Sequence, residues 1–281
     1  SEMENLINLV TFQLLSNQLS GSIPAWIGNL SNLQNFTIAD NNFSGNIPME
    51  LGNLNELKYL RLEQNQLVGD VPDEIGNLLN LEILSLNENN LTGEIPNWIG
   101  DFINLTALKL DNNQLSGHIP SDIGNLVYLQ NLSLNDNNFS GSLPVEVSNL
   151  SDLSYLRLQN NNFSGLITNQ ICDLSELDFS DSWFFNISNN QFCPLYPECI
   201  ELHVGQQDTS NCSTSNCADG EVELWGTCYD ISTTTSIDLS NSGLSGEIPP
   251  SIGELTNLFS LYLPNNSLSG EIPSELFDIT G

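Results

Sequence analysis

Positive charge is what this sequence has least of. Only 4 of its 281 residues are Lys or Arg, against 35 Asp or Glu, and the formal net charge is −31. Nucleic acids and anionic membranes are bound through basic surfaces, so the composition argues against both as partners. Apolar residues still make up 39% of the chain, which is enough for a hydrophobic core, so the charge does not indicate disorder.

Two further absences narrow the class of protein. No apolar run approaches the roughly 18 residues of a membrane-spanning helix, so we expect no membrane insertion in this segment. Catalytic frames such as GxSxG, HExxH, Walker and GxGxxG are missing, and the 2 histidines are His118 and His203. We therefore predict no enzymatic activity, no cofactor and no metal site.

What the sequence does contain is a repeat of 24 residues. Glycines recur at this step from Gly21 to Gly165, and the pattern resumes at Gly246 and Gly270. Between glycines the frame reads GxIPxxIGNLxNLxxLxLxxNxLS, for instance over residues 93–116. The LxL part alternates with period two, which predicts a short strand with two leucines inward. One such strand cannot bury its apolar side alone, so successive coils must stack.

An asparagine follows each predicted strand. These residues are Asn17, Asn41, Asn65, Asn89, Asn113, Asn137 and Asn161. The chain turns inward at this point, where a buried amide can satisfy backbone groups of its own coil and of the adjacent one. We therefore expect a ladder of buried asparagine side chains along the stack.

The frame resembles the leucine-rich repeat, and its GxIP element resembles the plant-specific subclass of receptor-like kinases, receptor-like proteins and polygalacturonase inhibitors. Similar repeats of this length occur in secreted bacterial proteins. The resemblance implies an α/β solenoid, in which a right-handed, curved array carries a concave parallel β-sheet. It also implies short 3-10 or helical turns and short second strands on the other side.

All 6 cysteines lie in the part of the chain that loses the 24-residue step: Cys172, Cys193, Cys199, Cys212, Cys217 and Cys228. Their Cx5C and Cx4C spacings do not match a usual zinc frame, so disulfides in an oxidising compartment are favoured. The resemblance implies cysteine-rich caps at the solenoid ends. Sequential pairing (Cys172–Cys193, Cys199–Cys212, Cys217–Cys228) is the most economical of the connectivities that six cysteines allow.

These patterns divide the chain into four segments. Residues 1–171 hold about seven repeats with no N-terminal cap visible, and 172–216 hold the last, irregular repeat and a C-terminal cap. Residues 217–233, with Trp225, resemble an N-terminal cap, and 234–281 form a second, truncated array. Because the chain starts and stops within a repeat, we expect either a slice of a longer protein or ends that meet partners.

All four cations fall at outward positions of the predicted strands. Arg61, Lys109 and Arg157 occupy the same position of alternate coils, 48 residues apart, so they should form a row with a spacing of roughly 10 Å. The candidate binding residues of this face are Lys58, Tyr59, Arg61, Lys109, Tyr155 and Arg157.

Two interpretations of these cations stay open. Each could simply offset nearby carboxylates such as Glu63 and Asp111, which we favour for Lys58. Alternatively, the row and its tyrosines form a recognition stripe, since Arg and Tyr are enriched at binding hot spots.

The leading hypothesis is a non-catalytic binding module, secreted or on the cell surface, that uses its concave face for a protein, peptide or glycan ligand. An alternative is a structural protein whose uncapped ends associate head to tail into a filament or matrix. A weaker alternative is ice binding, as in some plant-type relatives. Ice binding needs a regular array of one side chain, and the concave positions are too varied for that.

Overall fold

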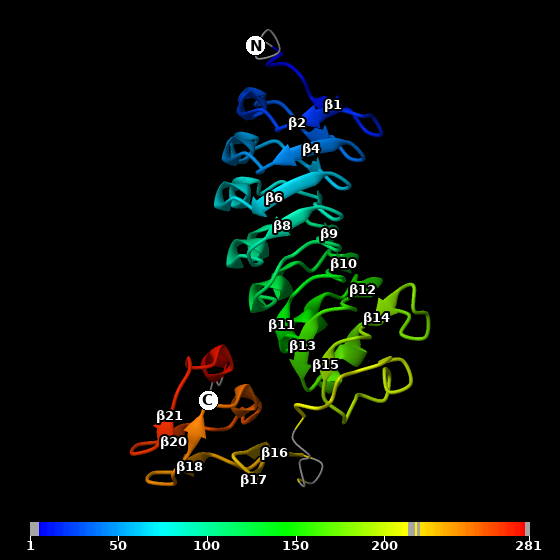
Figure 1. Cartoon of the computed structure of the whole chain (residues 1–281). Helices are drawn as coiled ribbons and strands as arrows, with labels where there is room; N and C mark the ends of the chain where they lie inside the picture. Colours follow the sequence, from blue (N-terminus) through cyan, green and yellow to red (C-terminus); the bar gives the residue numbers. More distant parts are fainter. Residues whose placement is uncertain (1–5, 213–216, 218–219, 279–281) are drawn as a thin grey trace. The chain divides into compact units, whose positions relative to one another are not determined.

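The computed structural model describes residues 6–212, 217 and 220–278. The chain forms two compact units, Ser1–Cys212 and Ser213–Gly281. In the first unit, successive coils of similar shape stack along the chain, each adding one strand to the same sheet (Figure 1).

The main sheet of the first unit has eight parallel strands in chain order. They are β1 (Thr11–Gln13), β3 (Asn35–Thr37), β5 (Tyr59–Arg61), β7 (Ile83–Ser85), β9 (Ala107–Lys109), β10 (Asn131–Ser133), β12 (Tyr155–Arg157) and β14 (Phe185–Asn186). Neighbouring strands from β1 to β12 pair at a shift of one repeat, as Arg61 does with Ser85 and Ser85 with Lys109, and β14 pairs with β12 at a longer shift, Arg157 with Asn186. The period of the sequence therefore sets the register of the sheet.

Short second strands follow the main strands. β2 (Ser20–Gly21), β4 (Asn42–Gly45), β6 (Gln66–Asp70) and β8 (Asn90–Thr92) form one sheet, and β11 (Ser140–Gly141), β13 (Asn162–Gly165) and β15 (Gln191–Phe192) form another. Strands β2, β4, β11 and β13 end at the repeat glycine, which takes a positive φ, as Gly45 does at φ +79. That backbone conformation is one that L side chains rarely adopt.

A 3-10 turn completes each coil. These turns are η2 (Ala25–Asn29), η3 (Met49–Asn53), η4 (Asp73–Asn77), η5 (Asn97–Asp101), η6 (Ser121–Asn125), η7 (Val145–Asn149) and η8 (Asn169–Asp173). In each of the first six, the proline of the GxIP element precedes the turn in extended backbone, as Pro72 does at φ −60 and ψ 140. None of the helices among the described residues is long and apolar enough to cross a membrane. The predicted solenoid of parallel strands, 3-10 turns and second strands is confirmed.

One continuous core fills the first unit. Inward leucines of successive strands, such as Leu60, Leu84 and Leu108, are at most 2% exposed and belong to one buried cluster. The aromatic rings of Phe139, Phe163 and Phe192 stack at centroid distances of 6.0 and 6.1 Å under the second strands. Burial of this apolar stripe from coil to coil is the main stabilising force of the stack.

The predicted asparagine ladder is present from Asn41 onward, whereas the side chain of Asn17 is exposed and bonds only carbonyls of its own coil. Asn89 donates from Nδ2 to the carbonyls of Leu62 and Leu86, both at 3.1 Å, which lie on the previous coil and on its own. Its Oδ1 accepts the backbone N–H of Leu67 at 3.0 Å. The same pattern recurs from Asn41 to Asn190, so each buried amide joins two coils.

Two of the three predicted disulfides are wrong. The bonds are Cys172–Cys199, Cys193–Cys212 and Cys217–Cys228, so only the last follows the sequential pairing. Cys172 lies in η8, on the opposite side of its coil from the strands, whereas Cys193 directly follows the second strand β15. The chain must therefore travel on past Cys193 before Cys199 comes within reach of Cys172.

The second unit has its own small core. An antiparallel hairpin of β16 (Glu221–Leu224) and β17 (Thr227–Asp230) precedes two coils. The coils contain β18 (Ser236–Asp238), β19 (Ser245–Gly246), η9 (Pro250–Glu254), β20 (Ser260–Tyr262), β21 (Ser267–Leu268) and η10 (Ser274–Asp278). Val222 and Leu224 of the hairpin share a buried cluster with Ile237 and Ile252 of the coils.

Candidate ligand-binding surface

The outward face of the main sheet holds a row of side chains in register. From β3 to β14 its members are Thr37, Arg61, Ser85, Lys109, Ser133, Arg157 and Asn186. We call Arg61, Lys109 and Arg157 the cation row, because they occupy alternate strands of this register. Parallel strands lie about 4.8 Å apart, so neighbouring cations are separated by roughly 10 Å.

Small hydroxyl residues separate the cations. Ser85 is 4% exposed and Ser133 is 6% exposed. Ser85 donates its hydroxyl to Asn87 at 3.1 Å, and Ser133 donates to Asn131 at 2.7 Å. These serines are buried and bonded locally, which leaves the longer cations as the groups of the row that a ligand meets.

Lys58 lies beside this row and is paired. Its Nζ is 2.8 Å from Glu82 Oε1 on the next coil, and the Tyr59 hydroxyl donates to Glu82 Oε2 at 2.8 Å. The hydrogen bonds from Lys58 and Tyr59 lower the pKa of Glu82, and the bond to Glu82 raises the pKa of Lys58. The favoured interpretation of Lys58 as a local ion pair agrees with this geometry.

The three members of the cation row differ from Lys58. Among the described residues, none of them forms an ion pair with a carboxylate. Arg61 instead places its guanidinium 6.0 Å from the centre of the Tyr59 ring. In a chain with 35 acidic residues, three cations of one row therefore remain without a salt-bridge partner in the described part of the molecule.

Carboxylates follow two of the cations along their strands. Burial raises the pKa of Glu63, while Arg61 and Lys109 oppose that change. Burial also raises the pKa of Asp111, and the charge of Glu88 adds to the increase. At the equivalent position after Arg157 the chain has Gln159, so Arg157 is the least compensated cation of the row.

An aromatic corner adjoins Arg157 at the β14 end of the sheet. Its members are Tyr155, Trp183 and Phe184. The guanidinium of Arg157 lies 5.2 Å from the centre of the Trp183 ring. Tyr155 makes edge contacts with Phe184 at 4.9 Å and with Trp183 at 6.5 Å. The Trp183 side chain is 59% exposed, so the corner presents a large ring to solvent next to a cation.

The segment before β14 holds this corner in place. The Asp181 carboxylate accepts the backbone N–H of Trp183 at 2.8 Å, and the Asp181 carbonyl accepts that of Phe184 at 2.9 Å. Phe179 contacts Phe185 at 5.0 Å, which anchors the segment to the core. These contacts order the Trp183 backbone, so the corner needs little rearrangement before binding.

Two buried polar atoms lie beside the corner. Arg157 Nε and Gln159 Oε1 have no hydrogen-bond partner among the described residues. A buried donor or acceptor without a partner costs about 1–3 kcal/mol, so both side chains gain free energy if they turn toward an incoming polar group.

The sequence located the cation row and its tyrosines but missed Trp183 and Phe184. Tyr59 contacts Arg61 as its position indicates, whereas Arg157 contacts Trp183 rather than Tyr155. A signal for these two residues is present in the SWFF stretch of the sequence. Counting back from the inward Phe185 places Phe184 and Trp183 at the outward positions that Tyr59 and Lys58 occupy in their coil.

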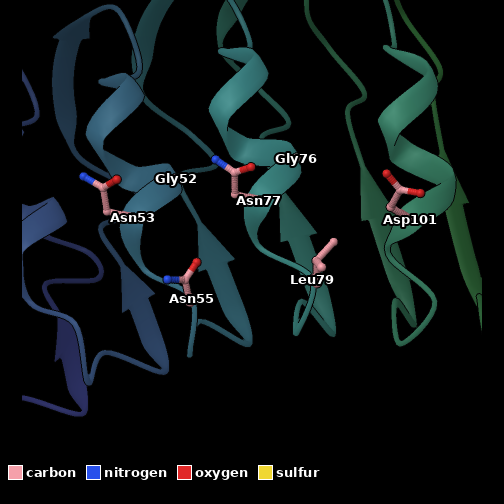
Figure 2. Close-up of a pocket in the computed structure, with 7 residues that line it drawn as sticks. All are labelled: Gly52, Asn53, Asn55, Gly76, Asn77, Leu79 and Asp101. Carbon is pink, nitrogen blue, oxygen red and sulfur yellow. The ribbon is translucent and has the colours of Figure 1, made fainter.

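A shallow hollow of about 590 Å³ lies between the 3-10 turns (Figure 2). Asn53, Asn77 and Asp101 line it from the ends of η3, η4 and η5. Trp98 packs against Gly76 here, where an added Cβ would lie 2.8 Å from the indole. The lining repeats the same turn position from coil to coil, so we interpret the hollow as a consequence of the stacking.

One cluster in the described residues has the composition of a metal site. It contains Cys217, Glu221 and Cys228. The two cysteines are bonded to each other, so neither sulfur is a thiolate ligand.

The comparisons with known proteins agree with this geometry. The sequence model of the Leucine Rich Repeat family matches nine segments: residues 8–30, 32–54, 56–78, 80–102, 104–126, 128–150, 152–174, 233–255 and 257–279. The chain belongs to this family. Among curated proteins, none matches the sequence.

Solved structures of plant receptors are similar to this chain. The peptide hormone receptor RGFR1, solved with RGF2, is 32% identical with a TM-score of 0.65, over 99% of this chain and 39% of that one. The Arabidopsis receptor kinase HAESA, solved with the peptide hormone IDA and the co-receptor SERK1, is 32% identical with a TM-score of 0.64. The match covers 99% of this chain and 41% of the HAESA chain. This chain thus spans about two fifths of the length of these receptor chains.

A plant ice-binding protein has the same fold. It is 24% identical with a TM-score of 0.56, over 94% of this chain and 75% of that one. No enzyme family is indicated by the family match or by these structures. Three disulfides and the similarity to extracellular receptor domains indicate a secreted or cell-surface protein.

Proposed function

We propose that the outward face of the main sheet recognises a polypeptide ligand, and that the cation row and the aromatic corner make the principal contacts. The observation that supports this most is the row itself: three cations without a carboxylate partner among the described residues of a chain with net charge −31. If these cations served only to neutralise the acidic surface, they would be expected to pair as Lys58 does with Glu82.

The aromatic corner supplies the second element of a binding hot spot. Arg, Tyr and Trp are the residue types that contribute most at protein interfaces, and they meet here within one cluster. The similar receptor structures contain peptide hormones, which supports a peptide as the ligand class of this chain. A glycan stays an alternative prediction.

A peptide display library selected on the whole protein tests this proposal. Peptides that bind wild type should lose affinity for Trp183→Ala and Arg157→Gln. Two matched variants should keep it: Lys58→Gln removes a cation that is already paired, and Phe259→Ala removes a 74% exposed ring of the second unit. Selected peptides that bind all four variants equally would refute the sheet face as the site.

One observation favours ice binding as a second candidate. An exposed amide follows the ladder asparagine in seven successive coils, and in four of them it lies within a second strand: Gln18, Asn42, Gln66, Asn90, Gln114, Asn138 and Asn162. This array of amides, with glutamine in three coils and asparagine in four, is more uniform than the outward positions of the main sheet. Thermal hysteresis of wild type, abolished by Asn42→Glu with Asn90→Glu but not by Asn112→Glu with Asn160→Glu in the turns that follow β9 and β12, would support this function.

We also propose that the disulfide-bonded segments act as end caps. Cys193–Cys212 closes the chain over the last coil of the first unit, where Gln207 donates to the Ile187 carbonyl at 2.9 Å. The hairpin of residues 221–230 buries Val222 and Leu224 against the second array. Head-to-tail association stays a prediction, and light scattering of the pure protein over a range of concentrations is its measurement.

A further inference from the structure

We infer that the ligand of the cation row is an extended peptide in the polyproline II conformation with an acidic residue at every third position. This inference rests on the proposed function and specifies its ligand. It follows from the spacing of the row, from the charge of its members and from the rings at its end.

The spacing selects the conformation. Arg61, Lys109 and Arg157 lie two strands apart in register, a separation of roughly 10 Å. A polyproline II helix has three residues per turn and rises about 3.1 Å per residue, so its side chains at i, i+3 and i+6 lie on one side at intervals of about 9 Å. In a β-strand, side chains on one side repeat at about 6.6 Å, which does not match the separation of roughly 10 Å between the cations.

Charge selects the side chains of the ligand. Arginine and lysine without salt-bridge partners bind carboxylates, and arginine does so with two parallel hydrogen bonds. The surrounding acidic surface does not prevent this, because at physiological ionic strength the Debye length is about 8 Å. Charges beyond that distance contribute little. Glu63 and Asp111 lie within it, beside Arg61 and Lys109, whereas Arg157 has Gln159 rather than a carboxylate at the next outward position.

Neighbouring carboxylates disfavour a wider ligand. Glu63 and Asp111 follow Arg61 and Lys109 on the same side of their strands, about 6.6 Å further along. An α-helix also repeats side chains near 10 Å, at i and i+7, but its diameter of about 10–12 Å would cover these carboxylates. A narrow polyproline II segment can follow the row without covering them.

The aromatic corner fits the same conformation. Proline-rich segments dock on grooves lined with aromatic rings, because their backbone is already ordered and proline rings stack on the side chains. Trp183, Tyr155 and Phe184 provide such rings beside the terminal cation of the row. We therefore expect prolines next to the acidic residue that contacts Arg157.

Three synthetic probes test the inference by fluorescence anisotropy at about 0.15 M salt, where the Debye length is about 8 Å. One has glutamate at every third residue of a proline frame, and one has the same composition with glutamate at every second residue. The third is an alanine-rich helix with glutamate at every seventh residue. The first probe should bind at least about tenfold more tightly than the others, a difference of about 1.4 kcal/mol.

The variants identify where the probe binds. The triple variant Arg61→Gln, Lys109→Gln, Arg157→Gln should lose the preference for the first probe, and Trp183→Ala should weaken its binding. Lys58→Gln should leave it unchanged. Equal binding of the first two probes, tighter binding of the helix, or an unaffected triple variant would overturn the inference.

A separate result identifies failure of the proposed function. If no probe binds but peptides from the display library still depend on Arg157 and Trp183, only the polyproline II ligand is refuted. If the library peptides are also insensitive to these variants, the sheet face itself is refuted as the binding site.

Discussion

The guanidinium of Arg157 lies over the Trp183 ring at 5.2 Å from its centre, and this contact joins a regular strand to an irregular segment. Arg157 belongs to β12, whose position follows from the 24-residue repeat. Trp183 belongs to the one coil of the first unit in which five extra residues precede the strand: Asn161 and Asn190 are 29 residues apart. The irregular coil thus places an exposed ring beside the least compensated cation.

The contact between Arg157 and Trp183 should be measurable as a coupling energy. A cation over an exposed ring contributes about 0.5–1 kcal/mol. In a double-mutant cycle of Arg157→Gln and Trp183→Ala, urea unfolding should show a coupling in this range. The pair Lys58→Gln and Trp183→Ala serves as the control and should be additive; coupling of similar size there would contradict the assignment.

The asparagine ladder should make a measurable contribution to the stability of each coil. Asn89→Ala leaves the N–H of Leu67 without a partner, whereas the carbonyls of Leu62 and Leu86 each keep one amide donor, from Asn65 and Asn113. The loss should cost about 1–3 kcal/mol. The adjacent, exposed Asn90 is the matched control, and its alanine variant should change stability by less than about 0.5 kcal/mol. Chemical unfolding followed by circular dichroism measures the stability of both variants. Similar losses of stability for the two would show that the ladder hydrogen bonds are not the cause.

Peptide mapping without reduction should give the disulfide pattern of the structure. Cleavage after Glu176, Glu198 and Glu201 places the four cysteines of the first unit on separate peptides. Mass spectrometry should then find Cys172 linked to the peptide of residues 199–201. A disulfide link between Cys172 and the peptide of residues 177–198, which contains Cys193, would instead support the sequential pairing.

Neutralising Glu63 should stabilise the protein at neutral pH. Burial raises the pKa of this carboxyl above its ordinary value of 4.5, so the folded state holds the proton more tightly than the unfolded state. Wild type therefore gains stability from this group as the pH falls through the raised pKa, and ionised Glu63 opposes folding above it. Glu63→Gln should have a higher Tm at pH 7 than wild type, with the gain disappearing below pH 4.5.

The exposed Glu56 of the same coil is the control for that prediction. Glu56→Gln should produce no comparable pH-dependent gain in Tm. A gain for Glu63→Gln that stays constant from pH 7 to pH 4 would mean that its source is packing rather than ionisation.

Much of the architecture follows from the sequence alone. Alternation with period two determines which leucines of β5 and β7 face the core, and the 24-residue period determines that Arg61, Ser85 and Lys109 share one row. The position of Asn89 after its strand likewise determines its place in the ladder. These features are local and repetitive, so each coil carries the information for its own place in the stack.

The remaining features were decided by the tertiary structure. The pairing of Cys172 with Cys199 depends on the path of the chain after Cys193, which follows no period. Whether Lys58 or Arg61 binds a carboxylate depends on side-chain distances between coils, and only Lys58 reaches Glu82. Trp183 meets Arg157 because contacts within the irregular segment orient it, and such contacts form only once the chain has folded.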